Sequence, residues 1–468
     1  MRRRKKKQKA PKKIIIHEEQ LHHLLRNSKE PETPLSQNIL QLNGEEDFLS
    51  FFNAYQHVLL LPSLPQLDTE SLEVLRDTSG IYMVKYAMKI LWFSQQHEML
   101  SYLKKQLSFA CYKIQQYIPW ATIGTHVFTV KVILHRRKNS STWNITEKYV
   151  EARHTILPIK HAIQCSNVRG MDVDQLILDI EHIALQIIQN KDDLFLPHRS
   201  VGVDISLDYN GEIWITQICS NPVKMKGNKK NMHTLFKTDP YLSIFIPETK
   251  EFEMENENTL LSFLHQYHEV IVKPISGSLG KGIMRIVVDA NSQYTVQHTN
   301  KIFQFTNASE LFLFLKQKIQ SKPYLIQQYI QLAKVKDSPF DLRVIVQKKS
   351  NDCTWKVTGI FAKVAFDGYF TTNLAKKGTA MAVSQAIHSS NLKGINSEEL
   401  LQKIYDVALR VAQNLEGISP HHRIWGLDMG VDFDGTVWMI EVNSKPGLKG
   451  FKSLENQSMF QTIQNYKQ

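Results

Sequence analysis

The sequence lacks any long uncharged apolar run. Its 468 residues contain no stretch that approaches the ~18 apolar residues of a membrane-spanning helix, so we expect no transmembrane helix. Near the N-terminus, only residues 14–16 form an apolar run before Glu18, which is too short for the core of a signal peptide. We therefore expect a cytoplasmic protein.

Cysteine is also scarce. The four cysteines, Cys111, Cys165, Cys219 and Cys353, show no CxxC spacing. Four cysteines without dense spacing do not form a disulfide framework, and we expect reduced, buried thiols.

Acidic residues are absent from residues 1–13, where nine positions are Lys or Arg. These nine carry most of the formal net charge of +12, so the rest of the chain carries only +3. Like charges at this density favour disorder. The segment is therefore either a solvated tail or a tether for polyanions. It contains no aromatic residue for base stacking, which makes specific nucleic-acid recognition less expected.

The remaining chain repeats itself. The stretch "LSFFNAYQHVLLLP" (49–62) aligns with "LSFLHQYHEVIVKP" (261–274), and "YKIQQYI" (112–118) with "YLIQQYI" (324–330), both at a separation of 212. Farther on, "AIQCSNVRG" (162–170) aligns with "AIHSSNLKG" (386–394) at a separation of 224, so the second copy has gained 12 residues. A fixed internal period indicates a duplicated domain, and we expect domains at 14–227 and 228–468.

Each copy predicts an α+β fold. In the second copy, apolar residues recur at helical spacing over 260–267, and strands are predicted at 269–274 and at 282–288. A helix near 308–320, strands near 324–329, 341–348 and 355–363, and a helix near 397–416 follow. We expect Ser397 to cap that last helix and Gly417 to lie just beyond its end. A hairpin completes the copy.

A glycine-rich loop follows the strand that ends near Lys273. Gly277, Gly280 and Gly282 let backbone N–H groups curl around an anion such as phosphate, and Lys273 adds a mobile charge. A tight hairpin could use the same glycines, so the loop alone is weak evidence for a phosphate-binding site.

The closing hairpin supplies acids. If Asp434-Gly435 forms a two-residue turn, Phe433 pairs with Thr436, Asp432 with Val437 and Asp428 with Glu441. Asn443 then shares the face of Glu441. Two facing carboxylates with an amide oxygen suit Mg²⁺. Asp432 is a second-ranked candidate ligand. The alternative is a solvated face with scattered acids.

Cations accompany this set. Arg343 and Lys363 lie on predicted strands, and Asn373, Lys377 and Gly378 lie in the loop gained by the second copy. Each of these residues alone would be an ordinary surface charge or loop residue. Together with the glycine loop and the carboxylates, they form a set that can stabilise a transferring phosphoryl group.

Three motifs resemble those of the ATP-grasp superfamily: "IVKPISGSLGKGI", "FDLRVIVQ" and "GLDMGVDFDGTVWMIEVNSKPGLKG". Their exact residues are similar to those of its endospore coat-associated YheC/YheD group. The resemblance is specific over 228–452 and extends to 14–227 through the repeat. It implies ATP between two α+β lobes, adenine on the backbone of 327–330, and ligation of a carboxylate to an amine or similar nucleophile through an acyl phosphate. The usual acid for the ribose is missing, since only Gln331 and Asp337 follow the hinge.

The loop and the resemblance together assign three groups of residues. Metal ligands are Asp428, Glu441 and Asn443, and catalytic cations are Arg343 and Lys363. ATP would contact Lys273, Ser276, Gly277, Ser278, Gly280, Lys281, Gly282, Gln327, Gln328, Tyr329, Ile330 and Asn373.

The first copy lacks most of this set. It carries Leu61 at the position of Lys273, "LPQLDTE" at the glycine loop (64–70), Lys131 for Arg343, Glu151 for Lys363, Gln217 for Glu441 and Cys219 for Asn443, while Asp204 retains the carboxylate of Asp428. The apolar positions persist. We therefore expect tandem ATP-grasp-like domains with a degenerate first copy that acts as a scaffold, a partner-binding surface or part of an acceptor site.

Three functions remain open from the sequence. The first is an ATP- and Mg²⁺-dependent ligase-like enzyme associated with spore formation. The second is a non-catalytic ATP-binding structural or interaction protein of the spore coat, which would place the chain there. The third is a polyanion-binding protein that uses residues 1–13.

Overall fold

The structure is a computed structural model. It describes residues 15–17, 39–63, 71–86, 89–138, 140–153, 155–196, 198–222, 225, 228–253, 256–275, 277, 281–319, 322–349, 352, 354–372, 377–392 and 394–466. The basic segment 1–13, the loop 64–70 and Cys353 lie outside these residues.

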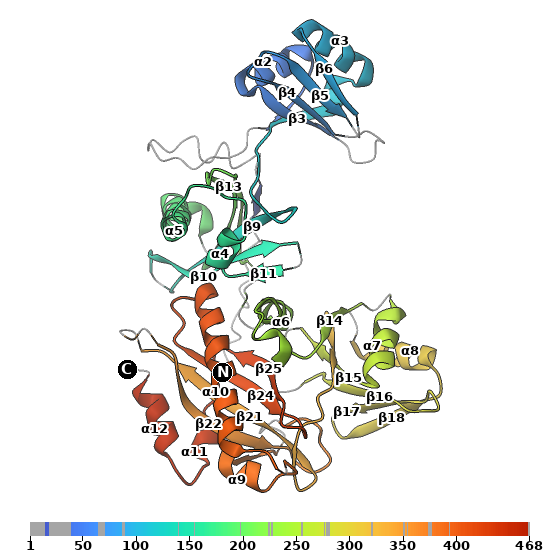
Figure 1. The fold of residues 1–468 in the computed structure, drawn as a ribbon, viewed down its shortest axis with the longest axis vertical. Coiled ribbons are helices and arrows are strands. Elements are labelled where there is room, and N and C mark those ends of the chain that lie inside the picture. The colour runs from blue at the N-terminus through green and yellow to red at the C-terminus, as the bar shows by residue number, and fades with distance from the viewer. Residues whose placement is uncertain are drawn as a thin grey trace, which may run out of the picture. The chain divides into compact units, whose positions relative to one another are not determined.

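The chain divides into two compact units (Figure 1). Unit 1 comprises 1–153 and 159–222, and unit 2 comprises 154–158 and 223–468. The predicted domain limits of 14–227 and 228–468 stay predictions.

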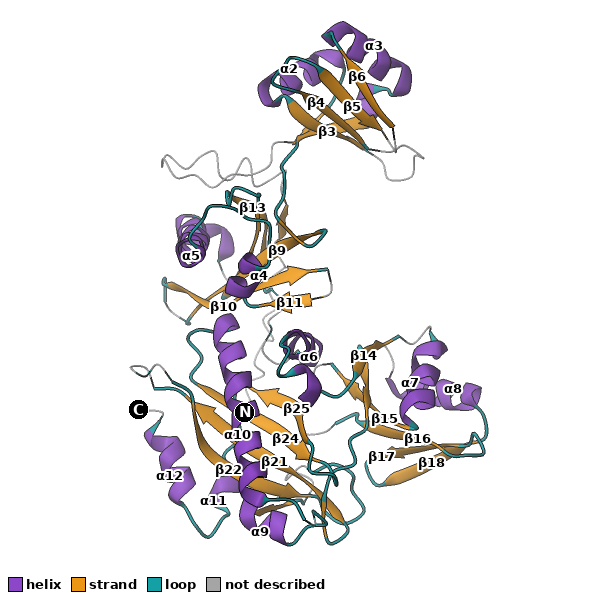
Figure 2. Cartoon of the chain, in the orientation of Figure 1, coloured by secondary structure: helices purple, strands orange, loops and turns teal. Residues whose placement is uncertain are grey.

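Unit 1 contains two antiparallel sheets with helices (Figure 2). In the first sheet the order is β2 (Ile39–Gln41), β7 (Tyr112–Gln116), β3 (His57–Pro62), β4 (Leu72–Arg76), β5 (Tyr82–Tyr86) and β6 (Lys89–Phe93), with helices α2 (Glu45–Tyr55) and α3 (Gln96–Gln106). The second contains β1 (Ile15–His17), β13 (Ile213–Ser220), β12 (Ser200–Leu207), β9 (His126–Arg136) and β10 (Trp143–Ala152), with β8 (Thr122–Ile123) beside β9 and helices α4 (Ile159–Gln164) and α5 (Val173–Asn190). Short 3₁₀ turns occur at Phe109–Cys111 and Asp192–Phe195.

Unit 2 repeats this arrangement. Its first sheet has the order β14 (Thr249–Phe252), β19 (Tyr324–Gln328), β15 (Glu269–Pro274), β16 (Met284–Val288), β17 (Tyr294–His298) and β18 (Lys301–Phe305), with α7 (Glu257–Tyr267) and α8 (Ala308–Ile319). Its second sheet has the order β23 (Thr379–Met381), β22 (Lys356–Val364), β21 (Ser338–Gln347), β24 (Ile424–Val431) and β25 (Val437–Asn443), with β20 (Lys334–Val335) beside β21. The other elements are β11 (Thr155–Leu157), α6 (Lys229–Thr238), a 3₁₀ turn (Ser243–Phe245), α9 (Val383–His388), α10 (Ser397–Ile418), α11 (Lys449–Lys452) and α12 (Ser458–Asn465).

The duplication is confirmed element by element. β3 and β15, and likewise β4 and β16, have bounds that differ by 212 positions, the offset read from the sequence. After the 12-residue insertion, α4 and α9, and β12 and β24, differ by 224. The two copies therefore share topology as well as sequence.

Alternating burial explains the strands. On β15, Val270 and Val272 are buried, and on β19 Ile326 is fully buried. These side chains pack against Leu260 and Leu311 of the helices that cover this face. The opposite face of the sheet carries Lys273 and Gln327, so the pleat separates core residues from candidate site residues.

Three local predictions are wrong. Helix α10 is capped by Asn396, whose side chain accepts from the backbone N–H of Glu398 at 3.0 Å and of Glu399 at 3.4 Å; a cap residue stands one position before Ser397 and takes its role. The helix also passes through Gly417 and ends at Ile418. The described cysteines are not buried, because Cys111 and Cys165 are exposed and Cys219 is half-buried.

The helices of both units are short or carry polar faces. Within the described ranges, no helix combines the length and the apolar character needed to cross a bilayer.

Candidate nucleotide-binding site

The β24–β25 hairpin does not turn where its Asp-Gly pair predicts. Oδ1 of Asp432 accepts from the backbone N–H of Asp434 at 3.1 Å and of Thr436 at 2.9 Å, and Gly435 has φ +82°. The turn therefore begins at Asp432, because this side chain closes it. Val437 pairs with Val431, so the predicted partners Asp432–Val437 and Phe433–Thr436 are wrong.

A bulge then restores the predicted pairing at the site. The register shifts by one residue between Asp428 and Met429, which leaves Ile440 unpaired. Asp428 consequently lies opposite Glu441, as predicted, and Gly426 lies opposite Asn443. An inserted residue of this kind is common where a strand must re-aim its side chains.

Asp428 is held by two cations. Nε of Arg343 donates to Oδ1 at 2.7 Å and Nη2 to Oδ2 at 3.2 Å, while Nζ of Lys363 lies 3.0 Å from Oδ1. Burial alone would raise the pKa of Asp428, but Lys363 and Arg343 hold it below its usual value. Asp428 and Glu441 face each other and need positive charge nearby. Arg343 and Lys363, the predicted catalytic residues, supply it for Asp428.

Asp341 completes this buried cluster and was missed by sequence reasoning. Its Oδ1 lies 3.0 Å from Nζ of Lys363, and Thr372 donates to its Oδ2. Burial raises the pKa of Asp341 to about 6 despite Lys363. The sequence signal is its position two residues before Arg343 on one strand, which places both on one face.

A cavity of about 220 Å³ in unit 2 brings together three of the predicted ATP contacts and two of the predicted metal ligands. Lys273, Gly277, Gln327, Glu441 and Asn443 line it. Both sheets of unit 2 contribute, because Lys273 lies on β15 and Gly277 in the loop after it, while Glu441 and Asn443 lie on β25. The structure thus brings a cation, a glycine, a carboxylate and an amide to one space.

Lys229 is a second cation in this cavity and was not predicted. It begins α6, and its Nζ lies 3.8 Å from Oε1 of Glu441. Burial, and then the like charge of Lys229, lower the pKa of Lys273 to about 8. Two amines near a single carboxylate leave this cavity suited to an anion.

Several predicted ATP contacts lie elsewhere. Tyr329 lines a second cavity of about 480 Å³, together with Gln331 and Asp337. Gln328 accepts from the backbone N–H of Glu248 at 3.4 Å. Ile330 is half-buried just after β19. The contact of the 327–330 backbone with adenine stays a prediction.

The glycine loop is described only in part. Lys281 is exposed, and Gly282 has φ +75°. A Cβ on Gly282 would lie 2.7 Å from the hydroxyl of Tyr324, so this position requires glycine. Four further predicted contacts, Ser276, Ser278, Gly280 and Asn373, lie outside the described residues.

The predicted metal ligands carry the donor atoms that Mg²⁺ requires. Two carboxylates and an amide oxygen are hard donors of the right kind; Glu441 and Asn443 line the cavity, and Asp428 is the cross-strand neighbour of Glu441. In the described part of the chain, no three His, Cys, Asp or Glu residues are grouped to hold a metal. The donor chemistry therefore fits Mg²⁺ through Glu441 and Asn443, and the assignment of all three ligands stays a prediction.

Unit 1 has the same strand pairing as the Asp428 cluster of unit 2 but a different set of charged side chains. Asp204 lies opposite Gln217 with the same bulge after it. Nζ of Lys131 lies 2.8 Å from Oδ2 of Asp204 and 3.4 Å from Oε2 of Glu151. Burial opposes it, but these two acids raise the pKa of Lys131. One lysine thus bridges two acids, whereas Asp428 of unit 2 meets two cations.

Comparison with known proteins identifies the class. The YheC/D-like ATP-grasp family model matches the chain twice in tandem, over residues 12–227 and 224–467. The chain belongs to this family, and the resemblance read from its motifs is confirmed.

Named relatives agree with this membership. The chain is 32% identical over 228 residues to the endospore coat-associated protein YheD of Bacillus subtilis (strain 168), covering 47% of this chain and 48% of the relative. It is 25% identical over 209 residues to the endospore coat-associated protein YheC of the same organism, covering 44% of this chain and 56% of the relative. The chain thus spans about half the length of the curated relatives it matches.

Among solved structures, the L-amino acid ligase of Bacillus licheniformis is similar at 16% identity. The match covers 52% of this chain and 48% of that one, with a TM-score of 0.31.

Proposed function

We propose that unit 2 binds ATP with Mg²⁺ and ligates a carboxylate to an amine or similar nucleophile. The observation that carries this proposal is the cavity that buried Lys273 and half-buried Lys229 line together with Glu441 and Asn443. Cations for phosphates and oxygen donors for a divalent ion are what ATP-dependent phosphoryl transfer requires. Family membership supports the same reading.

The residues divide into two tasks. Lys273 and Lys229 bind phosphate oxygens, and Glu441 and Asn443 hold Mg²⁺ next to them. Arg343 and Lys363 stabilise charge that develops on the transferring group. ATP with Mg²⁺ supplies the phosphoryl group that activates the carboxylate as an acyl phosphate.

The test of this proposal is ADP release by the full chain with Mg²⁺ and mixtures of carboxylates and amines. Replacement of Lys273 by Met should abolish release and the stabilisation of the fold by MgATP. Full turnover by Lys273→Met would show that this cavity is not the site.

A second candidate is a non-catalytic ATP-binding structural or interaction protein of the spore coat. The names of two relatives, endospore coat-associated proteins, favour it. It predicts stabilisation by MgATP without ADP release under any acceptor mixture. Fractionation of sporulating cells would show whether the chain is cytoplasmic or in the coat.

We infer that unit 1 is a degenerate copy without nucleotide. Leu61 stands in place of Lys273, and Lys131 is shared between Asp204 and Glu151. Titration calorimetry should therefore give one nucleotide per chain. A stoichiometry of two would refute the degeneracy.

Residues 1–13 are proposed to bind polyanions through charge alone. Their binding to polyphosphate or nucleic acid should weaken steeply with added salt. A truncated chain lacking them should lose this binding, and equal binding without them would exclude the tether.

A further inference from the structure

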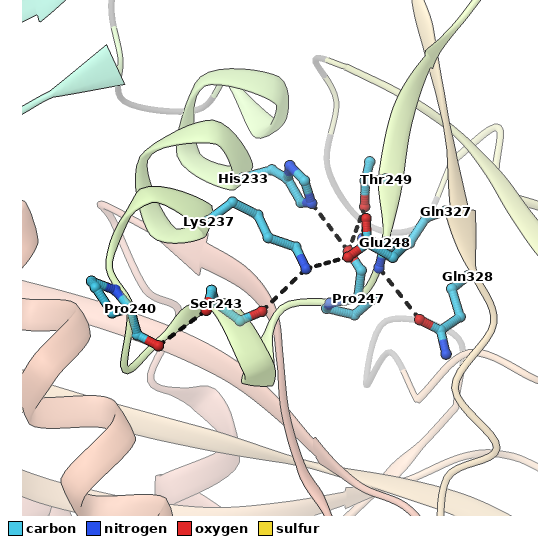
Figure 3. Close-up of polar contacts among 9 residues, drawn as sticks. All are labelled: His233, Lys237, Pro240, Ser243, Pro247, Glu248, Thr249, Gln327 and Gln328. Atoms are coloured by element: carbon cyan, nitrogen blue, oxygen red, sulfur yellow. Dashed lines mark hydrogen bonds and ion pairs between the residues drawn. The ribbon is translucent and has the colours of Figure 1, made fainter. Parts of the chain in front are cut away.

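Lys273 lies at the end of a chain of hydrogen bonds. Its Nζ donates to Oε1 of Gln327 at 2.7 Å, and Nε2 of Gln327 donates to Oγ1 of Thr249 at 2.7 Å. Thr249 donates to the carbonyl of Pro247 at 3.0 Å, and the same carbonyl lies 3.1 Å from Nε2 of His233. Figure 3 shows the far part of this chain, with His233 on α6, Pro247 and Thr249 around the start of β14, and Gln327 near the end of β19; Lys273 itself lies on β15.

The direction of this chain is fixed at its far end. A carbonyl only accepts hydrogen bonds, so the Thr249 hydroxyl must give its proton to Pro247. Burial, the main cause, lowers the pKa of His233 to about 4, so its imidazole is neutral at pH 7 and donates from Nε2. Thr249 can then only accept from Gln327, which turns the Gln327 amide oxygen toward Lys273.

This arrangement leaves Lys273 without a directly paired carboxylate, and Glu441 favours its charged form only from a distance. Lys363 contacts two carboxylates, whereas Lys273 donates to a neutral amide and, among the described residues, forms no ion pair. The Lys273 side chain is nevertheless buried and lines the cavity. A neutral acceptor orients an ammonium group without cancelling the field that an anion would meet.

We propose that Gln327 is a positioning residue, which aims Lys273 into the cavity and keeps its positive charge available to an anionic ligand. This inference rests on the proposed function, where the ligand is the phosphate chain of ATP. It gives the Gln327 side chain a role that the predicted backbone contact with adenine does not include.

Unit 1 offers a matched position. Gln115 lies opposite Leu59 in the register in which Gln327 lies opposite Ile271. Leu61 stands where Lys273 stands, and the lysine opposite this position, Lys113, lies on the strand of Gln115 itself, so Gln115 has no amine at the position of Lys273. Substitution of Gln115 therefore controls for the general effect of a new acid on this sheet.

The experiment uses the full chain with Gln327→Glu, Gln327→Met and the control Gln115→Glu. Glutamate at 327 keeps the shape of glutamine but forms an ion pair with Lys273. Binding of inorganic triphosphate and of ADP, without divalent metal, is measured by calorimetry. Gln327→Glu should weaken the affinity for triphosphate and for ADP at least ten-fold, about 1.4 kcal/mol. Gln327→Met should weaken both affinities about three-fold, because only the orientation of Lys273 is lost. Gln115→Glu should change neither affinity by more than about two-fold.

A second readout does not depend on nucleotide. Competitive acetylation followed by mass spectrometry reports the reactivity of Lys273 in each folded variant. Gln327→Glu should slow its acetylation about five-fold at pH 8, because an ion pair keeps the amine protonated, and Gln115→Glu should not.

The two readouts separate the two proposals. Unchanged anion binding by Gln327→Glu, or an equal loss in Gln115→Glu, would overturn the role of Gln327. A wild-type chain that binds no anion would refute the proposed function. In that case, equal acetylation of Lys273 in the wild type and in Gln327→Glu would also refute the positioning role.

Discussion

Replacement of Asp428 by Asn should destabilise unit 2. Asn keeps the shape but removes the charge that Arg343 and Lys363 share, and it presents an amide N–H to one of them. All three side chains are at most 15% exposed. Removing one partner of a buried ion pair costs about 3–5 kcal/mol. Asp341 still contacts Lys363, so we take ~3 kcal/mol, the lower end of that range.

The assay is thermal unfolding, and unit 1 supplies the control. For a unit of this size, ~3 kcal/mol corresponds to a decrease of about 6–12 °C in Tm. Asp204→Asn should cost only ~1 kcal/mol, because Lys131 keeps Glu151 and is 26% exposed. The units can unfold in separate transitions, so the affected transition should differ between the variants. A cost below ~1 kcal/mol for Asp428→Asn, or equal costs for both variants, would show that the cluster is not a compensated buried set.

Three further outcomes follow from the contacts. Glu441→Gln should change stability by less than ~1 kcal/mol, since Glu441 is 31% exposed and 3.8 Å from Lys229, yet it should lose the MgATP-induced melting shift; a full shift would misplace the metal site. His233 has a folded pKa of about 4 against 6.5 when unfolded, so this residue lowers stability as pH drops from 6.5 to 4, while Asp341, whose pKa is raised to about 6, acts in the opposite direction. His233→Gln should therefore make the stability of unit 2 fall less, or rise more, over this window in urea titrations, and an unchanged slope would exclude His233. Deletion of residues 1–13 should leave ADP release intact, and its loss would show that the segment contributes to the site.

The sequence predicts the elements of this fold well because its patterns are local. Alternating burial along most of β15 is visible in the residues themselves, whereas β19 buries four residues in a row. The duplication adds a second reading of every element, since each strand of unit 1 tests its counterpart in unit 2. Element types could therefore be predicted from the residues alone, whereas the facing of Asp428 and Glu441 is reached through an incorrect turn whose error a bulge cancels.

The charge pairing could not be predicted in the same way. Contact of Asp428 with Arg343 and Lys363 depends on the order β22-β21-β24, which joins segments up to 85 residues apart. The hydrophobic pattern sets which face a residue occupies but not which strand lies beside it. Asp341 and Lys229 were missed for this reason, because each gains its role only from a neighbour distant in the chain.

The hairpin shows why a correct pair can follow from an incorrect turn. The turn closes at Asp432, one residue earlier than the Asp-Gly count assumes, and the bulge at Ile440 shifts the register back by one. Unit 1 has the same two features, with Asp208 accepting from the backbone of Asn210 and Glu212 and the same shift after Asp204. There Gln217 replaces the glutamate, so the bulge persists without the predicted metal ligand. The bulge therefore belongs to the hairpin, and unit 2 places its carboxylates on a geometry that does not depend on a glutamate at this position.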